Sequence, residues 1–201
     1  MKKLLLSVLM IACVAISANA QKTAKKKSPI ANIESISFYG VDFSQGKVYG
    51  VTDEADKLKK AFEEINGLFV SQPAKYNVAE LTGKKVNRTN VKAVSTSNSN
   101  IPAGNVKTTN SNFTISNQNI TAALKNLKID AGDSGTGFVV VTQQLNKTSG
   151  IGTYYMVFFD IKTRNIVSSF KLTGVAAGSG LRDYWAASVY DAMKKVKKYK
   201  Q

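Results

Sequence analysis

One stretch near the end of the chain combines residue types that can hold an anion. Gly178, Ser179 and Gly180 follow a strand-like run, and Arg182 and Asp183 open an amphipathic segment. Free backbone N–H groups at a helix N-terminus attract anions, and an arginine can hold a phosphate or carboxylate with two hydrogen bonds. The spacing fits none of the phosphate-loop motifs. A tight strand-to-helix turn, with Asp183 as the helix cap, explains the same residues, so both interpretations stay open.

Three aspartates could supply the paired carboxylates of a glycan hydrolase. Asp42 and Asp160 end predicted strands, and Asp183 begins a predicted helix. Such enzymes hold two carboxyl groups about 5–9 Å apart. Turn formation explains Asp160 and helix capping explains Asp183 equally well. We therefore keep a carboxylate-dependent hydrolase as an alternative and assign no catalytic residue.

A third pattern is a run of aromatic residues in the apolar segment 153–159. Tyr154, Tyr155, Phe158 and Phe159 could form a ligand platform. Alternating aromatic residues in an apolar strand more often belong to the core. We expect these residues to be buried.

The composition excludes several classes of chemistry. The chain has no histidine and one cysteine, Cys13. Ser-His-Asp and Cys-His catalysis and histidine metal sites are therefore ruled out. A zinc-thiolate site would need several cysteines. We expect no metal and no cofactor.

The N-terminus has the pattern of a secretory signal peptide over residues 1–20. Lys2 and Lys3 precede an apolar run over 4–16, and Ala18-Asn19-Ala20 forms a small-residue cleavage site before Gln21. The pattern predicts export, to the periplasm or to the outer membrane or cell surface. Lipid attachment at Cys13 is disfavoured, because such signals prefer leucine where Met10 stands. The run is shorter than the roughly 20 residues of a membrane-spanning helix, and no later segment is longer, so we expect no transmembrane segment after cleavage.

The chain is strongly basic, with a formal net charge of +15. The excess lies at the two ends, whereas residues 30–193 hold 17 basic and 13 acidic residues. The terminal lysines of the exported form are Lys22, Lys25, Lys26, Lys27, Lys194, Lys195, Lys197, Lys198 and Lys200. Anionic lipid headgroups or envelope polysaccharides are suitable partners for such ends, and solvated tails are the alternative. Nucleic acid is not an expected partner, since no binding motif is present.

Hydrophobic periodicity predicts one domain over residues 33–201, after a basic, disordered segment at 21–32. We expect a polar loop at about 86–115, because proline, asparagine, serine and threonine interrupt every period there. Expected strands cover 36–43, 47–51, 85–91, 137–145, 153–159 and 166–172, and expected helices cover 52–67, 76–81, 117–128 and 183–199. This order predicts an α/β fold of the α+β type, with a mixed sheet, a C-terminal three-strand meander and about three packed helices.

Three segments resemble a family of small exported Bacteroidota proteins of unknown function. They are Gly40-Val41-Asp42-Phe43-Ser44, Val157-Phe158-Phe159-Asp160-Ile161 and Gly180-Leu181-Arg182-Asp183-Tyr184-Trp185-Ala186. The signal ending Ala-Asn-Ala before Gln21 is also similar to Bacteroidota signals. The order of elements is similar to that of curli-secretion lipoproteins and of the TolB amino-terminal domain. The resemblance implies export and an α/β fold and supplies no activity.

Together these patterns predict an exported, non-catalytic cell-envelope protein that binds another protein or an anionic envelope component. A carboxylate-dependent glycan hydrolase using some of Asp42, Asp160 and Asp183 is one alternative. A small-anion receptor using residues 178–183 is the other.

Overall fold

The computed structural model describes residues 30–200, and of Lys200 only the backbone. The predicted signal peptide and the lysines at positions 22–27 lie outside the described residues. The strands are β1 (Ser35–Asp42), β2 (Lys47–Tyr49), β3 (Lys85–Thr89), β4 (Lys107–Thr108), β5 (Thr136–Asn146), β6 (Ile151–Asp160) and β7 (Ile166–Val175). The helices are α1 (Ala55–Ser71), α2 (Val78–Thr82), η1 (Val91–Val94), α3 (Ser95–Ser99), α4 (Ala103–Val106), α5 (Asn117–Asn126), α6 (Gly180–Lys194) and η2 (Lys195–Lys200).

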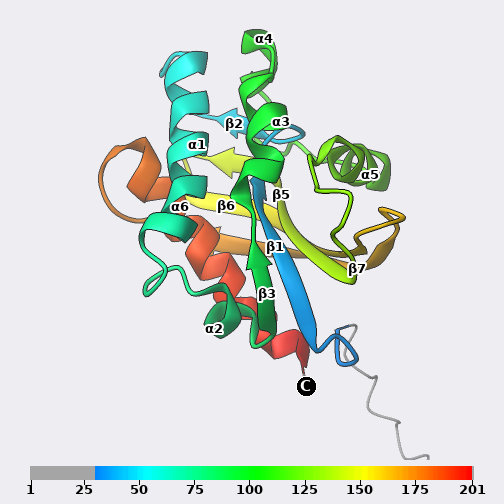
Figure 1. The fold of residues 1–201 in the computed structure, drawn as a ribbon. Helices are drawn as coiled ribbons and strands as arrows, with labels where there is room; N and C mark the ends of the chain where they lie inside the picture. The colour runs from blue at the N-terminus through cyan, green and yellow to red at the C-terminus, as the bar shows by residue number, and fades with distance from the viewer. Residues whose placement is uncertain (1–29, 201) are drawn as a thin grey trace, which may run out of the picture.

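All seven described strands form one mixed sheet around β5. Along one side of β5, the parallel strands β1 and β2 follow each other, and β3 and β4 pair with them in turn. On the other side, β6 and β7 complete an antiparallel meander. The sheet is strongly twisted, so that β1 and β7 cross at a steep angle in Figure 1. The predicted fold class, a single α/β domain with a mixed sheet and a C-terminal meander, is confirmed.

Two hydrophobic cores lie on the two faces of the sheet. The larger one joins α1, α2 and α6 to side chains such as Phe38, Phe138 and Phe158. The smaller one joins η1 and α5 to Tyr39, Val139 and Phe159. Because both faces are covered, the central strand β5 is buried over nearly its whole length, as expected for a strand between two helical layers.

Helix α1 departs from its expected bounds at both ends. It begins at Ala55, three residues after Thr52, because Glu54 has an extended backbone and is the N-cap residue. It continues past Gly67 to Ser71, because Leu68 and Phe69 extend the buried stripe of the helix. Gly67 lies on the exposed side, where a glycine weakens a helix without ending it.

The prediction of a polar loop at about 86–115 is wrong, because most of this segment has secondary structure. It contains most of β3 and all of η1, α3, α4 and β4. These pieces are too short to show a hydrophobic period, and single buried side chains such as Val94, Ile101 and Val106 attach them to the two cores. Tertiary contacts therefore order a stretch whose composition predicts a loop.

Candidate functional site

The loop predicted to bind an anion, residues 178–183, connects β7 to α6. Gly178 and Gly180 have φ angles of +98° and +71°, a region that favours glycine. Helix α6 begins at Gly180, and the N-cap residue Ser179 makes no side-chain capping hydrogen bond. The helix therefore starts three residues before Asp183, and Asp183 is not its cap.

The Arg182 guanidinium already holds a carboxylate from its own loop. Its Nε donates to Asp183 Oδ1 at 2.8 Å and its Nη2 donates to Oδ2 at 3.2 Å. These hydrogen bonds hold the pKa of the Asp183 carboxyl below its ordinary value. Ser179, Gly180 and this ion pair border a hollow of about 340 Å³ against Lys57, Lys60 and Glu64 of α1. An anion that bound the Nε and Nη2 edge of the guanidinium would have to displace Asp183.

The three aspartates of the hydrolase alternative do not share a site. Asp42 lies opposite Val141 of β5, and Asp160 lies opposite Thr136. At about 3.4 Å per residue, these positions are roughly 17 Å apart along β5 alone. Asp183 is half-exposed. It comes after the end of β7 at Val175, whereas Asp160 lies beside the start of β7 at Ile166. Asp42 and Asp160 are therefore too far apart for acid and base catalysis, and Asp183 borders a hollow against α1 that neither of the others lines.

Asp160 has a structural role in the β6–β7 hairpin. Its Oδ1 accepts hydrogen bonds from the Thr163 backbone N–H at 2.8 Å and from the Thr163 hydroxyl at 2.9 Å. These bonds lower the pKa of the Asp160 carboxyl. The turn interpretation of Asp160 therefore agrees with the geometry.

The aromatic residues of β6 belong to the core, as predicted. Tyr154, Phe158 and Phe159 are fully buried, and Tyr155 is half-buried. The Tyr154 hydroxyl donates to Ser188 Oγ of α6 at 3.0 Å. These rings leave no open platform for a ligand.

Two buried asparagines fix the end of β1, where Asp42 lies. Asn66 Oδ1 accepts the Val41 N–H and Asn98 Oδ1 accepts the Phe43 N–H, both at 2.7 Å. Both amides also donate to the Val41 carbonyl oxygen. Gly40, with a φ of +90°, makes room for this arrangement, since a Cβ there would lie 2.5 Å from Asn66 Oδ1. The strand therefore ends in a bulge held by side chains of α1 and α3.

Asp42 is a fully buried carboxyl group with hydroxyl partners. Its Oδ1 accepts the Ser44 backbone N–H at 2.8 Å and the Ser44 hydroxyl at 2.6 Å, and Ser97 Oγ donates to Oδ2 at 3.2 Å. Among the described residues, no basic side chain pairs with it. Burial raises the pKa of the Asp42 carboxyl, and the hydrogen bonds from Ser44 and Ser97 only partly oppose this.

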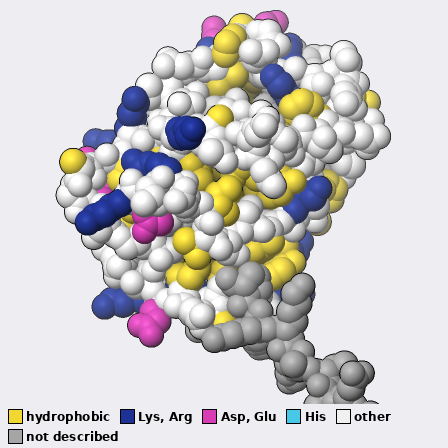
Figure 2. Space-filling model, turned by 90° about the vertical axis from the view of Figure 1, so that its right-hand side faces the viewer, with side chains coloured by type: hydrophobic (Ala, Val, Ile, Leu, Met, Phe, Trp, Pro, Cys, Tyr) yellow, Lys and Arg dark blue, Asp and Glu magenta, His cyan; other side chains and the backbone are white. Residues whose placement is uncertain are grey.

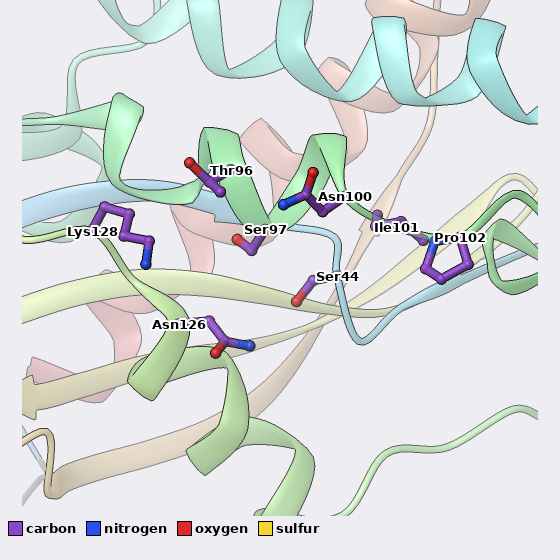
Figure 3. Close-up of a pocket in the computed structure, with 8 residues that line it drawn as sticks. All are labelled: Ser44, Thr96, Ser97, Asn100, Ile101, Pro102, Asn126 and Lys128. Atoms are coloured by element: carbon purple, nitrogen blue, oxygen red, sulfur yellow. The ribbon is translucent and has the colours of Figure 1, made fainter.

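In front of the two serines lies a polar hollow of about 340 Å³. Asn126 is the last residue of α5, and Lys128 follows two residues later. Figure 3 shows that both face Ser44 and Ser97 across this hollow. Ile101 and Pro102 border it beyond Ser44. The complete lining is Ser44, Thr96, Ser97, Asn100, Ile101, Pro102, Asn126 and Lys128. It lies at the carboxyl end of a parallel strand, where open α/β sheets commonly bind ligands.

The sequence pointed to only one part of this site. Asp42 stands out at the end of a predicted strand, whereas Ser97 and Asn100 lie in a stretch with no hydrophobic period. Lys128 is the last residue of the expected helix 117–128, a position where a lysine commonly interacts with the helix dipole. Only the register of β1 against β5 and the docking of α3 bring these residues together.

The lysine-rich C-terminus ends beside the start of the described chain. The Lys84 ammonium, just after α2, donates to the Ile30 carbonyl oxygen at 2.7 Å, and η2 packs against α2. In Figure 1 the C-terminus and the beginning of β1 lie at the same end of the molecule. We call this end of the molecule the basic pole and define it by Ile30, the first described residue, and the exposed Lys194, Lys197 and Lys198.

Elsewhere the positive charge is dispersed. On the face drawn in Figure 2, lysine and arginine side chains stand at separate points and do not form a continuous patch. Several of the described cations are paired with acids, among them Lys57 with Asp53 and Arg88 with Asp130 and Asp133. On this face, as the charge pattern predicts, the basicity is not spread over a broad binding surface.

Comparison with known proteins adds no relative. No family model matches the chain, and no curated protein matches it. The resemblance to exported Bacteroidota proteins and the export itself therefore stay predictions.

Two further properties hold for residues 30–200. No group of three or more histidine, cysteine, aspartate or glutamate side chains in this range is placed to hold a metal ion. No helix in the same range is both long and apolar enough to cross a membrane.

Proposed function

We propose that this chain is an exported, non-catalytic cell-envelope protein that binds an anionic envelope component through its basic pole. The observation that carries the proposal is that the lysine-rich C-terminus and the first described residue, Ile30, lie at the same end of the molecule. In the sequence the lysine clusters at 22–27 and 194–200 lie on either side of the whole domain. In the fold, η2 packs against α2, and Lys84, just after α2, holds Ile30.

The charge balance at the pole supports an anionic partner. Lys194, Lys197 and Lys198 are exposed there, and none of them forms an ion pair among the described residues. Lys85 is also exposed and lies next to Glu34, where β3 begins. The acids close in sequence to these lysines are Glu34, Glu80 of α2 and Asp191, and Asp191 is paired with Lys195 at 2.9 Å. Clustered lysines attract an anionic lipid surface by about 1 kcal/mol each.

The sequence adds further lysines to the same end of the chain. Lys25, Lys26 and Lys27 precede Ile30 by five residues or fewer. Export, which the signal pattern over residues 1–20 supports, would bring these lysines to the anionic lipids and polysaccharides of an envelope. The resemblance to exported Bacteroidota proteins points the same way.

The test is co-sedimentation of the exported form with vesicles. Phosphatidylglycerol vesicles should bind the protein at low salt, phosphatidylcholine vesicles should not, and high salt should release it, because exposed charges are screened. A parallel assay with the polyuronate alginate tells a polysaccharide surface from a lipid surface.

Matched variants locate the binding surface. Replacing Lys194, Lys197 and Lys198 by glutamine should weaken binding at least tenfold. Replacing Lys60, Lys92 and Lys125, which are also exposed and form no ion pair among the described residues but lie on α1, η1 and α5, should have little effect. Equal losses in the two variants, or no binding to either anionic surface, would contradict the proposal.

A further inference from the structure

We propose that the polar hollow in front of Asp42 is a second binding site, for an acidic monosaccharide unit such as a glycuronate. This site goes beyond the proposed function, because the hollow and the basic pole lie at opposite ends of β1. Eight strand residues separate them, which is roughly 25 Å at about 3.3 Å per residue. Either proposal can therefore fail without the other.

The first argument is the unused hydrogen-bonding capacity of the lining. The side chains of Thr96, Asn100 and Asn126 make no hydrogen bond within the described chain, although all three border the hollow. A carboxamide offers two donors and an acceptor, and a hydroxyl offers both kinds of bond. Sugar hydroxyls also donate and accept, so they match this set better than a simple anion, which only accepts.

The second argument is the charge. Lys128 Nζ is directed toward the hollow in Figure 3 and has no ion-pair partner among residues 30–200. No acidic side chain belongs to the lining. The Asp42 carboxyl group does not belong to the lining and lies behind Ser44, whose hydroxyl donates to it at 2.6 Å. A ligand carboxylate beside Lys128 would therefore meet one free cation.

The third argument is the shape of the hollow. Ile101 and Pro102 form an apolar border, against which the C–H face of a pyranose ring can pack. A volume of about 340 Å³ lies at the small end of ordinary ligand sites, which begin at roughly 300 Å³. One sugar unit, free or at the end of a glycan, fits this size.

Asp42 would act as a positioning residue. Its Oδ1 accepts the Ser44 hydroxyl at 2.6 Å and so fixes the orientation of one polar side chain of the lining. Asn66 and Asn98, which we call the asparagine clamp, hold the backbone on both sides of Asp42 by accepting the Val41 and Phe43 N–H groups.

The experiment is saturation-transfer difference NMR on the exported form with sodium glucuronate as the probe. Glucose and inorganic phosphate serve as the neutral and the non-sugar comparison. We expect transfer to glucuronate, at least tenfold weaker binding of glucose, and no competition by phosphate at equal concentration. Lys128→Gln and Asn126→Asp should each weaken glucuronate binding at least tenfold, the second because it places a like charge in the lining.

The control variant is Lys125→Gln, which removes an exposed lysine of α5 that does not line the hollow. It should bind glucuronate like the wild type, and thermal unfolding should show that all three variants are folded. Absence of transfer, equal binding of glucose, displacement by phosphate, or unchanged binding in Lys128→Gln would each overturn the proposal. Vesicle binding should be the same in Lys128→Gln as in the wild type, which separates the two sites.

Discussion

Gly152 and Gly174 lie directly opposite each other on β6 and β7, at the place where helix α6 crosses the sheet. Ser188 of α6 contacts both: its hydroxyl donates to the Gly174 carbonyl oxygen at 2.8 Å, and a Cβ on Gly152 would lie 2.4 Å from its Oγ. A Cβ on Gly174 would lie 1.8 Å from the Ser188 carbonyl oxygen. The two glycines therefore allow the helix backbone to approach the sheet closely.

Gly174→Ala should destabilise the fold strongly, because the clashing atom belongs to the helix backbone and cannot rotate away. We expect a loss of about 3 kcal/mol or more in the free energy of unfolding. Urea denaturation followed by the fluorescence of Trp185, the buried and only tryptophan, measures it. Gly67→Ala is the matched control: nothing lies within 4 Å of its Cβ position in α1, so it should gain about 0.5–1 kcal/mol. A small effect of Gly174→Ala would mean that α6 can shift at low cost.

Asp42→Asn should stabilise the protein at neutral pH. Burial raises the pKa of the Asp42 carboxyl, so the folded protein holds a proton that the unfolded chain, with a pKa of about 3.9, has released. Stability therefore falls as the pH rises from about 4 to the raised pKa, and stays lower above it. Asparagine can accept the same Ser44 hydrogen bonds without ionising, so the variant should lack this fall.

Thermal unfolding across this pH range checks the prediction. Asp160→Asn is the control and should show no such gain, because hydrogen bonds from Thr163 lower the pKa of that exposed carboxyl. An Asp42→Asn variant that is less stable than the wild type at every pH would show that the carboxylate charge itself stabilises the bulge.

Asn98→Ala should lower the free energy of unfolding far more than Asn100→Ala, although Asn98 lies in α3 and Asn100 is the C-cap residue of the same helix. The first change leaves the buried Phe43 N–H without its partner and removes a donor from the Val41 carbonyl oxygen. At about 1–3 kcal/mol for each unsatisfied buried group, a loss of about 2–4 kcal/mol is expected. Asn100 is exposed, so its removal should change the free energy of unfolding by less than about 0.5 kcal/mol. Chemical denaturation of both variants measures the two losses of stability. Similar losses would show that the hydrogen bonds of Asn98 do not stabilise the end of β1.

Arg182→Ala should have little effect on stability. Its ion pair with Asp183 is about half exposed on both sides, and such pairs contribute less than about 1 kcal/mol. Vesicle binding should also be unchanged, because α6 begins at this loop and reaches the basic pole only at its other end. A marked loss of vesicle binding would move the anion site to residues 178–183.

How much of this protein follows from sequence differs between its two halves. From residue 117 onward, long uninterrupted patterns predict each strand and helix, and errors are confined to boundaries such as the start of α6 at Gly180. Between β3 and α5 the hydrophobic pattern fails, because the elements have five residues or fewer and bury at most two side chains each. Short elements depend on tertiary contacts for their stability, and a single sequence does not reveal those contacts.

The candidate site divides in the same way. By itself the sequence determined the absence of histidine chemistry, the α/β fold class and the concentration of lysines at both ends, because composition and hydrophobic period express these directly. Only the tertiary structure decided that Asp42, Asp160 and Asp183 stay apart, that the lysine-rich C-terminus ends beside the start of the fold, and that Ser44, Ser97 and Lys128 share one hollow. The physical reason is that strand register and helix docking fix distances between residues far apart in the chain, while local patterns report only which face of an element is buried.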